Sequence, residues 1–323
     1  MRKIICTLFM VCCAWVSLYA QTLSSVTSPD GSIVLRIGLR DKNLTYDVCK
    51  SGKIVLMEAP IRMTVDGAEV CNSPRLLSSD NYKTNDTYPI RGSHSMAVDK
   101  SNGLLLKLKN EKLKTDFTLE ARAYNDGIAF RLILPGDDKQ VRTPDEHTVF
   151  TLPAGSQVWY HDMYCHYEGL HQRKEVSEIT KGEWAAPPVT VQLPGNSGYL
   201  CLTESALMNY AGMSFQANGN NGFETKLGHA QPASYAFAHD YSLEDARRLS
   251  LPATITGTIT TPWRAVVIVD DLNGLVNTDL ITNLAPAPDK KLFPKGVNTE
   301  WIKPGRSVSV SYTHLRAHET LSD

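Results

Sequence analysis

The feature that most constrains this chain is a series of short segments in which apolar and polar residues alternate, each ended by a turn signal. Segment 32–39 follows the turn Pro29-Asp30-Gly31 and has an apolar residue at every second position. The clearest hairpin covers 120–134, with the turn Asn125-Asp126-Gly127 between its two halves. Comparable segments are 44–48, 54–57, 104–109, 117–121, 189–193, 199–203, 253–261 and 263–269. Alternation with period two indicates strands with one buried face, so the chain is predicted to be all-β, a large antiparallel sandwich.

A helical pattern is convincing only near the end of the chain. From Asp271 onward, apolar residues recur at a spacing that could place them on one side of a helix, until Pro286 and Pro288 end the pattern. We therefore predict a sandwich domain over 21–270, and a linker helix with the start of a further domain over 271–308. Residues 309–323 have no hydrophobic period and are predicted to be a non-native tail.

The first twenty residues have the layout of a secretory signal. Arg2 and Lys3 precede an apolar stretch, and Ala20 precedes Gln21. The stretch is shorter than the roughly 20 apolar residues that span a bilayer, so we do not interpret it as a membrane anchor. The mature chain is expected to be periplasmic or secreted, with no membrane association once the signal has been cleaved.

Charge and cysteine content exclude several classes of protein. The formal net charge is −1, and no basic patch indicates a nucleic-acid partner. Without the signal four scattered cysteines remain, at positions 49, 71, 165 and 201, and no CxxC pair occurs among them. This pattern is typical neither of a disulfide scaffold nor of a zinc site. Cys201 is expected to be a small buried residue of a strand.

The densest candidate for function is segment 159–171, which combines aromatic side chains with histidine, aspartate and glutamate. Aromatic rings stack on sugars, and the polar groups can bind their hydroxyls, so the segment suits a carbohydrate site on a loop. The alternative is a long loop whose aromatic residues only pack on the sandwich. His161, His166 and His171 are spaced by five, which matches no familiar zinc motif.

Five sequence motifs, in order along the chain, resemble glycoside hydrolase family 97. They are Thr27-Ser28-Pro29-Asp30-Gly31, then 121–131 (ARAYNDGIAFR), 203–210 (TESALMNY), Thr261-Pro262-Trp263-Arg264 and 301–306 (WIKPGR). The resemblance covers about residues 22–308. It implies a β-super-sandwich at the N-terminus of a secreted α-glucosidase or α-galactosidase. It also implies a catalytic (β/α)8 barrel that begins just past the last motif, and such a barrel takes about 250 residues.

The resemblance assigns roles to only a few residues of this chain. The catalytic carboxylates belong to the barrel, so no catalytic residue is assigned and the chain alone is expected to be inactive. Glu168 matches a family glutamate that binds Ca²⁺ together with barrel residues. The residues expected to line the sugar site are Tyr160, His161, Tyr167 and Trp184. For Trp184 and Trp263 plain packing is the alternative.

The expected partners are an oligo- or polysaccharide substrate and the protein's own missing barrel. Two other functions stay open at this point. One is a carbohydrate-binding sandwich that acts alone, and the other is a structural module that binds no sugar and associates through an exposed face.

Overall fold

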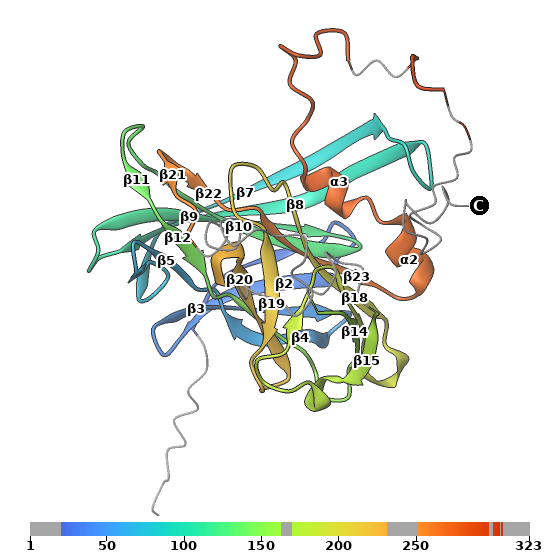
Figure 1. Ribbon diagram of the computed structural model, residues 1–323, viewed down its shortest axis with the longest axis horizontal. Coiled ribbons are helices and arrows are strands. Elements are labelled where there is room, and N and C mark those ends of the chain that lie inside the picture. Colours follow the sequence, from blue (N-terminus) through green and yellow to red (C-terminus); the bar gives the residue numbers. More distant parts are fainter. Residues whose placement is uncertain (1–20, 163–169, 231–250, 297–299, 304, 306–323) are drawn as a thin grey trace, which may run out of the picture. The chain divides into compact units, whose positions relative to one another are not determined.

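The structure is a computed structural model, and it describes residues 21–162, 170–230, 251–296, 300–303 and 305 (Figure 1). The chain divides into two compact units, Met1–Ala285 and Pro286–Asp323, and all the strands found in the described ranges belong to the first. The predicted signal (1–20) and tail (309–323) lie outside the described residues. None of the helices in the described ranges has the length and apolar character needed to cross a membrane.

Two large antiparallel sheets form the sandwich, which confirms the predicted all-β class. The first sheet contains, in spatial order, β1 (Gln21–Thr27), β2 (Ile33–Arg40), β3 (Asn43–Lys50), β4 (Lys53–Pro60), β13 (Val149–Thr151), β20 (Gly222–Leu227), β19 (Met213–Ala217) and β16 (Trp184–Ala185). The second contains β15 (Gln172–Glu175), β14 (Gln157–Tyr160), β17 (Val189–Gln192), β18 (Tyr199–Ser205), β23 (Trp263–Val269), β10 (Gly127–Leu134), β9 (Thr115–Tyr124), β8 (Met96–Asn110) and β7 (Pro74–Pro89), with β22 (Ile259–Thr260) paired to β10.

Smaller elements complete the unit. A three-stranded sheet contains β12 (Pro144–Glu146), β5 (Met63–Val65) and β6 (Ala68–Glu69), and a two-stranded sheet contains β11 (Val141–Arg142) and β21 (Ile255–Thr256). Three short 3₁₀ turns are η2 (Val176–Glu178), η3 (Pro194–Asn196) and η4 (Gly228–Ala230). The helices are α2 (Leu272–Asn277) and α3 (Leu280–Leu284).

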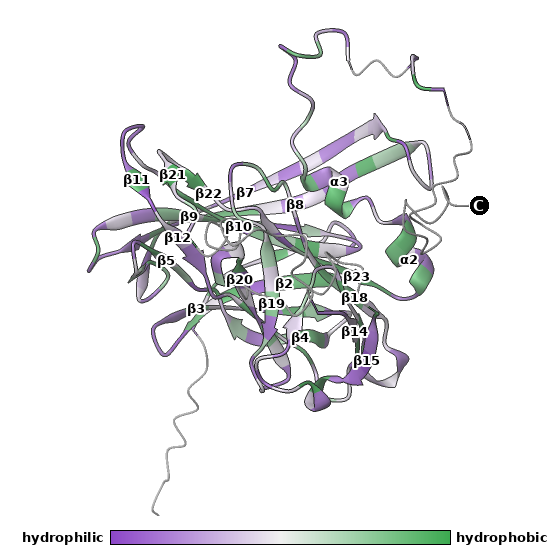
Figure 2. Cartoon of the chain, viewed as in Figure 1, coloured by the Kyte–Doolittle hydropathy of each residue, from purple (hydrophilic) through white to green (hydrophobic). Residues whose placement is uncertain are grey.

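The core lies between the two large sheets and follows from the alternation in the sequence. Ile33, Leu35 and Ile37 of β2 are fully buried, as are Leu104, Leu106 and Leu108 of β8. Green and purple alternate along several strands in Figure 2, as expected when one face of a strand is buried and the other is exposed. The predicted strands are therefore present, except that segment 253–261 is divided into β21 and β22, which belong to different sheets. The apolar faces of the two large sheets form one shared core.

Strand β23 differs because all seven of its residues are buried. Val266 and Ile268 face the main core, while Trp263 and Ala265 belong to a second cluster with Leu280 and Leu284 of α3. The predicted helical segment is thus divided into two short helices, and the second covers the outer face of the ten-stranded sheet. Asp271 caps α2 by accepting a hydrogen bond from the backbone N–H of Gly274 at 2.9 Å.

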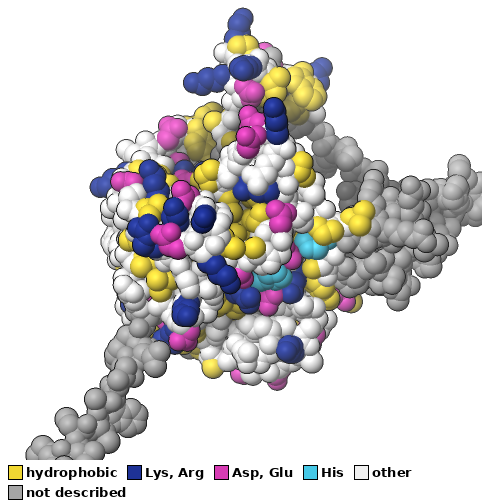
Figure 3. All heavy atoms as spheres, turned by 90° about the vertical axis from the view of Figure 1, so that its left-hand side faces the viewer, with side chains coloured by type: hydrophobic (Ala, Val, Ile, Leu, Met, Phe, Trp, Pro, Cys, Tyr) yellow, Lys and Arg dark blue, Asp and Glu magenta, His cyan; other side chains and the backbone are white. Residues whose placement is uncertain are grey.

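Three of the four remaining cysteines lie in the described ranges, and Cys165 lies outside them. Cys49, Cys71 and Cys201 are free thiols. Cys201 lies in β18 as expected, but it is half-buried on the outer face of the sheet, and burial raises the pKa of its thiol to about 11. On the face shown in Figure 3, acidic and basic side chains are intermixed, without a large area of one sign.

Candidate functional site

The segment singled out by its aromatic and histidine content connects two paired strands. β14 and β15 are antiparallel, with Tyr160 opposite Gln172. This pairing brings the two ends of the connecting segment together, and the ring centroids of His161 and His171 are 4.8 Å apart. Two of the predicted site residues, Tyr167 and Glu168, lie outside the described residues.

Tyr160 anchors the end of β14 in the core. Its ring is 1% exposed and lies 6.3 Å from that of Phe223. Its hydroxyl donates a hydrogen bond of 2.5 Å to Oε2 of Glu183, and burial raises its pKa to about 12. Because the ring is buried, it offers no face on which a sugar could stack in this structure. The predicted binding role of Tyr160 remains a prediction.

Glu183 connects the two strands to the turn that precedes β16. Its carboxylate accepts hydrogen bonds from Nζ of Lys174 at 2.8 Å and from the backbone N–H of Thr180 at 2.8 Å, besides that from Tyr160. Burial raises the pKa of Glu183, but these hydrogen bonds outweigh burial and lower it to about 2. The carboxylate is therefore a fixed negative charge beside Tyr160 and Lys174. Sequence reasoning did not single out this residue.

Two other predicted residues lie on neighbouring segments. His161 is 4% exposed, its Nδ1 is within hydrogen-bond distance of the backbone oxygen of Asp162, and its own carbonyl accepts from the N–H of Ala186 at 2.9 Å. Ala186 directly follows β16, the strand that carries the half-buried Trp184. The fold thus brings the segments of His161 and Trp184 together, and their roles toward a sugar remain predictions.

The same end of the sheet exposes apolar side chains. The register from β14 through β17 to β18 places the loop that follows Ser205 at the end where His161 lies. Leu207 and Met208 of this loop are 50% and 62% exposed, and Leu170 is 92% exposed. Exposed apolar side chains gathered in one region are typical of a surface that another part of a protein covers.

A metal site is not complete within the described residues. In those ranges no group of three or more His, Cys, Asp or Glu side chains could hold a metal ion. Ca²⁺ usually takes six to eight oxygen ligands. The predicted ligand Glu168 would therefore need partners from elsewhere.

The sequence motifs that resemble glycoside hydrolase family 97 contact one another and stabilise the fold. The backbone N–H of Asp30, in the first motif, donates to Oδ1 of Asn125 in the second at 3.1 Å. Arg131 lies over the ring of Trp263, with its guanidinium carbon 4.4 Å from the centroid. Trp263 is 2% exposed, so packing, the alternative considered for it, is what the structure shows.

A buried ion cluster joins two of these motifs to strand β12. Arg264 is 1% exposed, and its Nε and Nη2 donate to both carboxylate oxygens of Glu146, at 3.0 and 2.5 Å. Its Nη1 donates to Oε2 of Glu204 at 2.5 Å. Glu146 is 118 residues distant in sequence, so no local pattern could have indicated this pair. Arg264 and Glu204 therefore have a structural role in their motifs, because they hold distant segments together in the interior.

Comparison with known proteins agrees with this architecture. Residues 26–287 match the family model described as Glycosyl-hydrolase 97 N-terminal. A "Retaining alpha-galactosidase" of Bacteroides thetaiotaomicron is 28% identical over 332 aligned residues, which cover 95% of this chain and 46% of that protein. A "Probable retaining alpha-galactosidase" of Streptomyces bingchenggensis is 25% identical, over 81% of this chain and 36% of that protein.

Solved structures share the fold. A glycoside hydrolase family 97 enzyme from Pseudoalteromonas sp. strain K8, in complex with acarbose, has a TM-score of 0.70 at 20% identity, over 82% of this chain and 38% of that one. A β-arabinopyranosidase has a TM-score of 0.68 at 19% identity, over 82% and 43%. The chain spans less than half the length of the curated relatives it matches.

Proposed function

Because the chain belongs to the glycosyl-hydrolase 97 N-terminal family, we propose that it is the N-terminal β-sandwich domain of an exported α-glycosidase. The observation that carries this proposal is the match of 95% of the chain to a named α-galactosidase, together with the shared sandwich. Both curated relatives are named retaining α-galactosidases, which makes a terminal α-galactoside the first substrate to test.

The chain's own contribution would be to hold one side of the sugar site. Glycoside hydrolysis uses a pair of carboxyl groups. Two carboxylates that the fold brings together, Glu146 and Glu204, are committed to Arg264 in the interior. We therefore assign no catalytic residue to this chain. The exposed Leu170, Leu207 and Met208 would face the domain that carries catalysis.

Calcium belongs to the same proposal. Glu168 would supply one oxygen ligand at the segment between β14 and β15, and the remaining ligands would come from outside this chain. When bound there, Ca²⁺ would polarise oxygen atoms near the scissile bond. Tyr160, Lys174 and Glu183 would fix the ends of the two strands from which Glu168 extends.

The test is an assay of the whole protein, expressed from the source gene read past codon 308. We expect it to hydrolyse 4-nitrophenyl α-galactoside, and the 323-residue chain alone to be inactive. Glu168→Gln in the whole protein should lower the rate at limiting Ca²⁺, and saturating Ca²⁺ should restore part of it. A whole protein without activity on 4-nitrophenyl α-galactoside and α-glucoside would overturn the proposal.

A further inference from the structure

A polar groove lies on the outer face of the ten-stranded sheet, across β15, β14 and β17 and beside the turn between β17 and β18. The strand register aligns four side chains in one row: Glu175, Gln157, Gln192 and Tyr199. Their neighbours along the strands, including Val158 and Val191, are fully buried in the core. Since successive side chains alternate between faces, the row must point outward. The β17–β18 turn, with Pro194 and Asn196, forms one wall of the groove.

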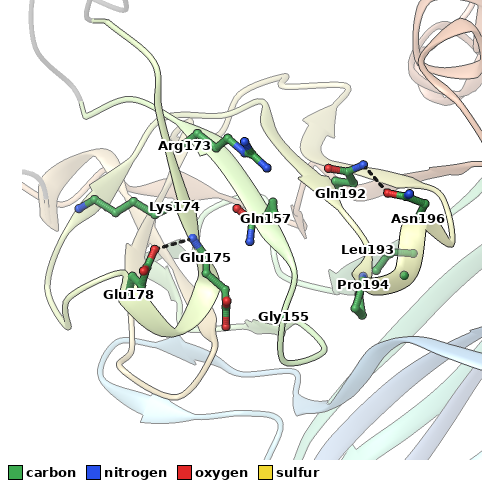
Figure 4. Close-up of a pocket in the computed structure, with 11 residues that line it drawn as sticks. Gly155, Gln157, Arg173, Lys174, Glu175, Glu178, Gln192, Leu193, Pro194 and Asn196 are labelled. Atoms are coloured by element: carbon green, nitrogen blue, oxygen red, sulfur yellow. Dashed lines mark hydrogen bonds between the residues drawn. The ribbon is translucent and has the colours of Figure 1, made fainter.

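The groove has a volume of about 400 Å³, which is within the range of small-molecule sites. Of the eleven residues that line it, seven have polar or charged side chains: Gln157, Arg173, Lys174, Glu175, Glu178, Gln192 and Asn196. Figure 4 shows Gln157, Arg173 and Gln192 reaching the groove from three adjacent strands, while Lys174 points away. A lining of this kind does not suit an apolar ligand.

The polar groups are held in place yet keep bonding capacity. The guanidinium carbon of Arg173 lies 5.2 Å from the ring centroid of Trp159, so the aromatic ring orients the side chain. Nε2 of Gln192 donates to Oδ1 of Asn196 at 3.0 Å. Among the described residues, the side-chain amide of Gln157 makes no hydrogen bond although the residue is half-buried. Its amide is therefore available to a polar ligand.

The charge of the groove is close to balanced. Arg173 contributes one positive charge to the lining, and Glu175 and Glu178 contribute two negative charges. The ammonium group of Lys174 points away from the groove and is bound to Glu183 at 2.8 Å (Figure 4). An anionic ligand would meet two carboxylates. A neutral ligand that carries many hydroxyl groups can both donate to carboxylate and amide oxygens and accept from amide and guanidinium N–H groups.

We propose that this groove binds a neutral oligosaccharide, at an accessory site separate from the predicted sugar site. Gln157 in the groove and Tyr160 of the predicted sugar site stand three positions apart on β14, roughly 10 Å along the strand. The amides of Gln157 and Gln192, the guanidinium of Arg173 and the carboxylate of Glu175 hydrogen-bond the hydroxyl groups of one or two sugar units. The open groove makes the binding weak, with a dissociation constant on the order of 1 mM. This binding does not require that the protein be a hydrolase.

The test is a titration of the 323-residue chain with raffinose and with panose, followed by NMR. The side-chain NH₂ signals of Gln157, Gln192 and Asn196 should shift with a common binding curve. No shift up to about 20 mM of either sugar would overturn the proposal. Two further titrations could also overturn it. One uses an acidic oligosaccharide, and the proposal is wrong if only this ligand shifts the side-chain signals. The other uses an extended peptide, and the proposal is wrong if the peptide shifts the backbone signals of β15 but not these side-chain signals.

Single substitutions distinguish sugar binding in the groove from sugar binding at the predicted site. Gln157→Ala and Arg173→Ala should each weaken binding about threefold to tenfold, as expected for the loss of one or two hydrogen bonds. Arg75→Ala, at an exposed ion pair on β7, serves as the matched control and should leave binding unchanged. If Trp184→Ala weakens binding while the groove variants do not, the sugar binds at the predicted site and the groove proposal is wrong. In the whole protein, the groove variants should leave hydrolysis of 4-nitrophenyl α-galactoside intact, which keeps this proposal distinct from the proposed function.

Discussion

Arg264 joins three parts of the chain that are far apart in sequence. It holds both oxygens of Glu146 and one oxygen of Glu204 in the interior, where neither Arg264 nor Glu146 is reached by water. Burial of the charges costs free energy, and the bidentate geometry offsets much of that cost. The pairing therefore fixes which segments meet more than it raises the total stability.

Removal of one partner of this ion cluster should strongly destabilise the folded chain. Arg264→Met leaves Glu146 buried without a counter-ion, and we expect a loss of about 3–5 kcal/mol in the free energy of unfolding, measured with urea. Arg75→Met, which breaks the exposed pair with Glu111, is the control and should cost less than about 1 kcal/mol. Equal stability of Arg264→Met and the parent chain would show that the cluster contributes nothing.

Glu183 makes the free energy of unfolding depend on pH in the acid range. Its pKa in the folded chain is about 2, below the ordinary 4.5, so the folded state favours the carboxylate. This contribution is fully present above about pH 5 and is lost as the pH falls toward 2. Because the side chain is 26% exposed, we expect about 1–2 kcal/mol. Glu183→Gln should be less stable than the parent at pH 7, and the difference should shrink between pH 5 and 2. A constant difference across that range would contradict this.

Among the elements, the β7–β8 hairpin has a structural role that could not be predicted from its sequence. Its outer part holds the helix that follows the sandwich. Tyr88 donates to Oδ1 of Asn283 at 2.7 Å, and Nδ2 of Asn283 donates to the carbonyl of Val98 at 2.9 Å. Asp279 accepts from the N–H of Val98 at 3.0 Å and is paired with His94. Two elements far apart in sequence are thereby joined by side chains of α3 and its cap.

Loss of Asn283 should loosen α3 locally. Asn283→Ala leaves the Tyr88 hydroxyl and the Val98 carbonyl without their partner, at a cost of about 1–3 kcal/mol. Hydrogen exchange at the backbone amide of Asn283, which donates to the carbonyl of Asp279, should become at least about tenfold faster, while that of Val266 in β23 stays unchanged. Asn277→Ala removes only an exposed bond within α2 and is the control. Uniform acceleration across the sheet would indicate global destabilisation instead.

Elements with one apolar face could be predicted from the sequence, and the others could not. The alternation of leucines in β8 and the Asn-Asp-Gly turn between β9 and β10 are local signals, and both are confirmed. Strand β7 lacks such a signal because most of its residues are exposed, and its partner β8 determines its conformation. The side chain of Tyr160 is buried through the register of β14 with β17, which depends on residues more than 20 positions away. The groove could not be predicted for the same reason, because its row of side chains comes from four strands that are paired through distant residues.

At the scale of the whole molecule, every strand that the structure describes and both apolar clusters belong to the unit that ends at Ala285. A chain of residues 21–285 should therefore fold like the longer one. We expect the same far-ultraviolet circular dichroism and a melting temperature within about 2 °C of that of the 323-residue chain. A shorter chain that ends at Asp270 lacks α3, exposes Trp263 and Ala265, and should melt at a distinctly lower temperature. If the 21–285 chain fails to fold, the boundary of the unit is misplaced.

The position of β23 in the ten-stranded sheet determines when the sandwich can close during synthesis. Among the described strands, the group β15-β14-β17-β18 and the group β10-β9-β8-β7 are joined within the sheet through β23, the last of these strands in sequence. A ribosome adds roughly 5–20 residues per second, so both groups emerge, with open edges, before their connector exists. Glu146 and Glu204 also emerge before Arg264, their common partner. The ten-stranded sheet therefore cannot be completed until β23 is released, and during that interval its open edges can pair with other chains.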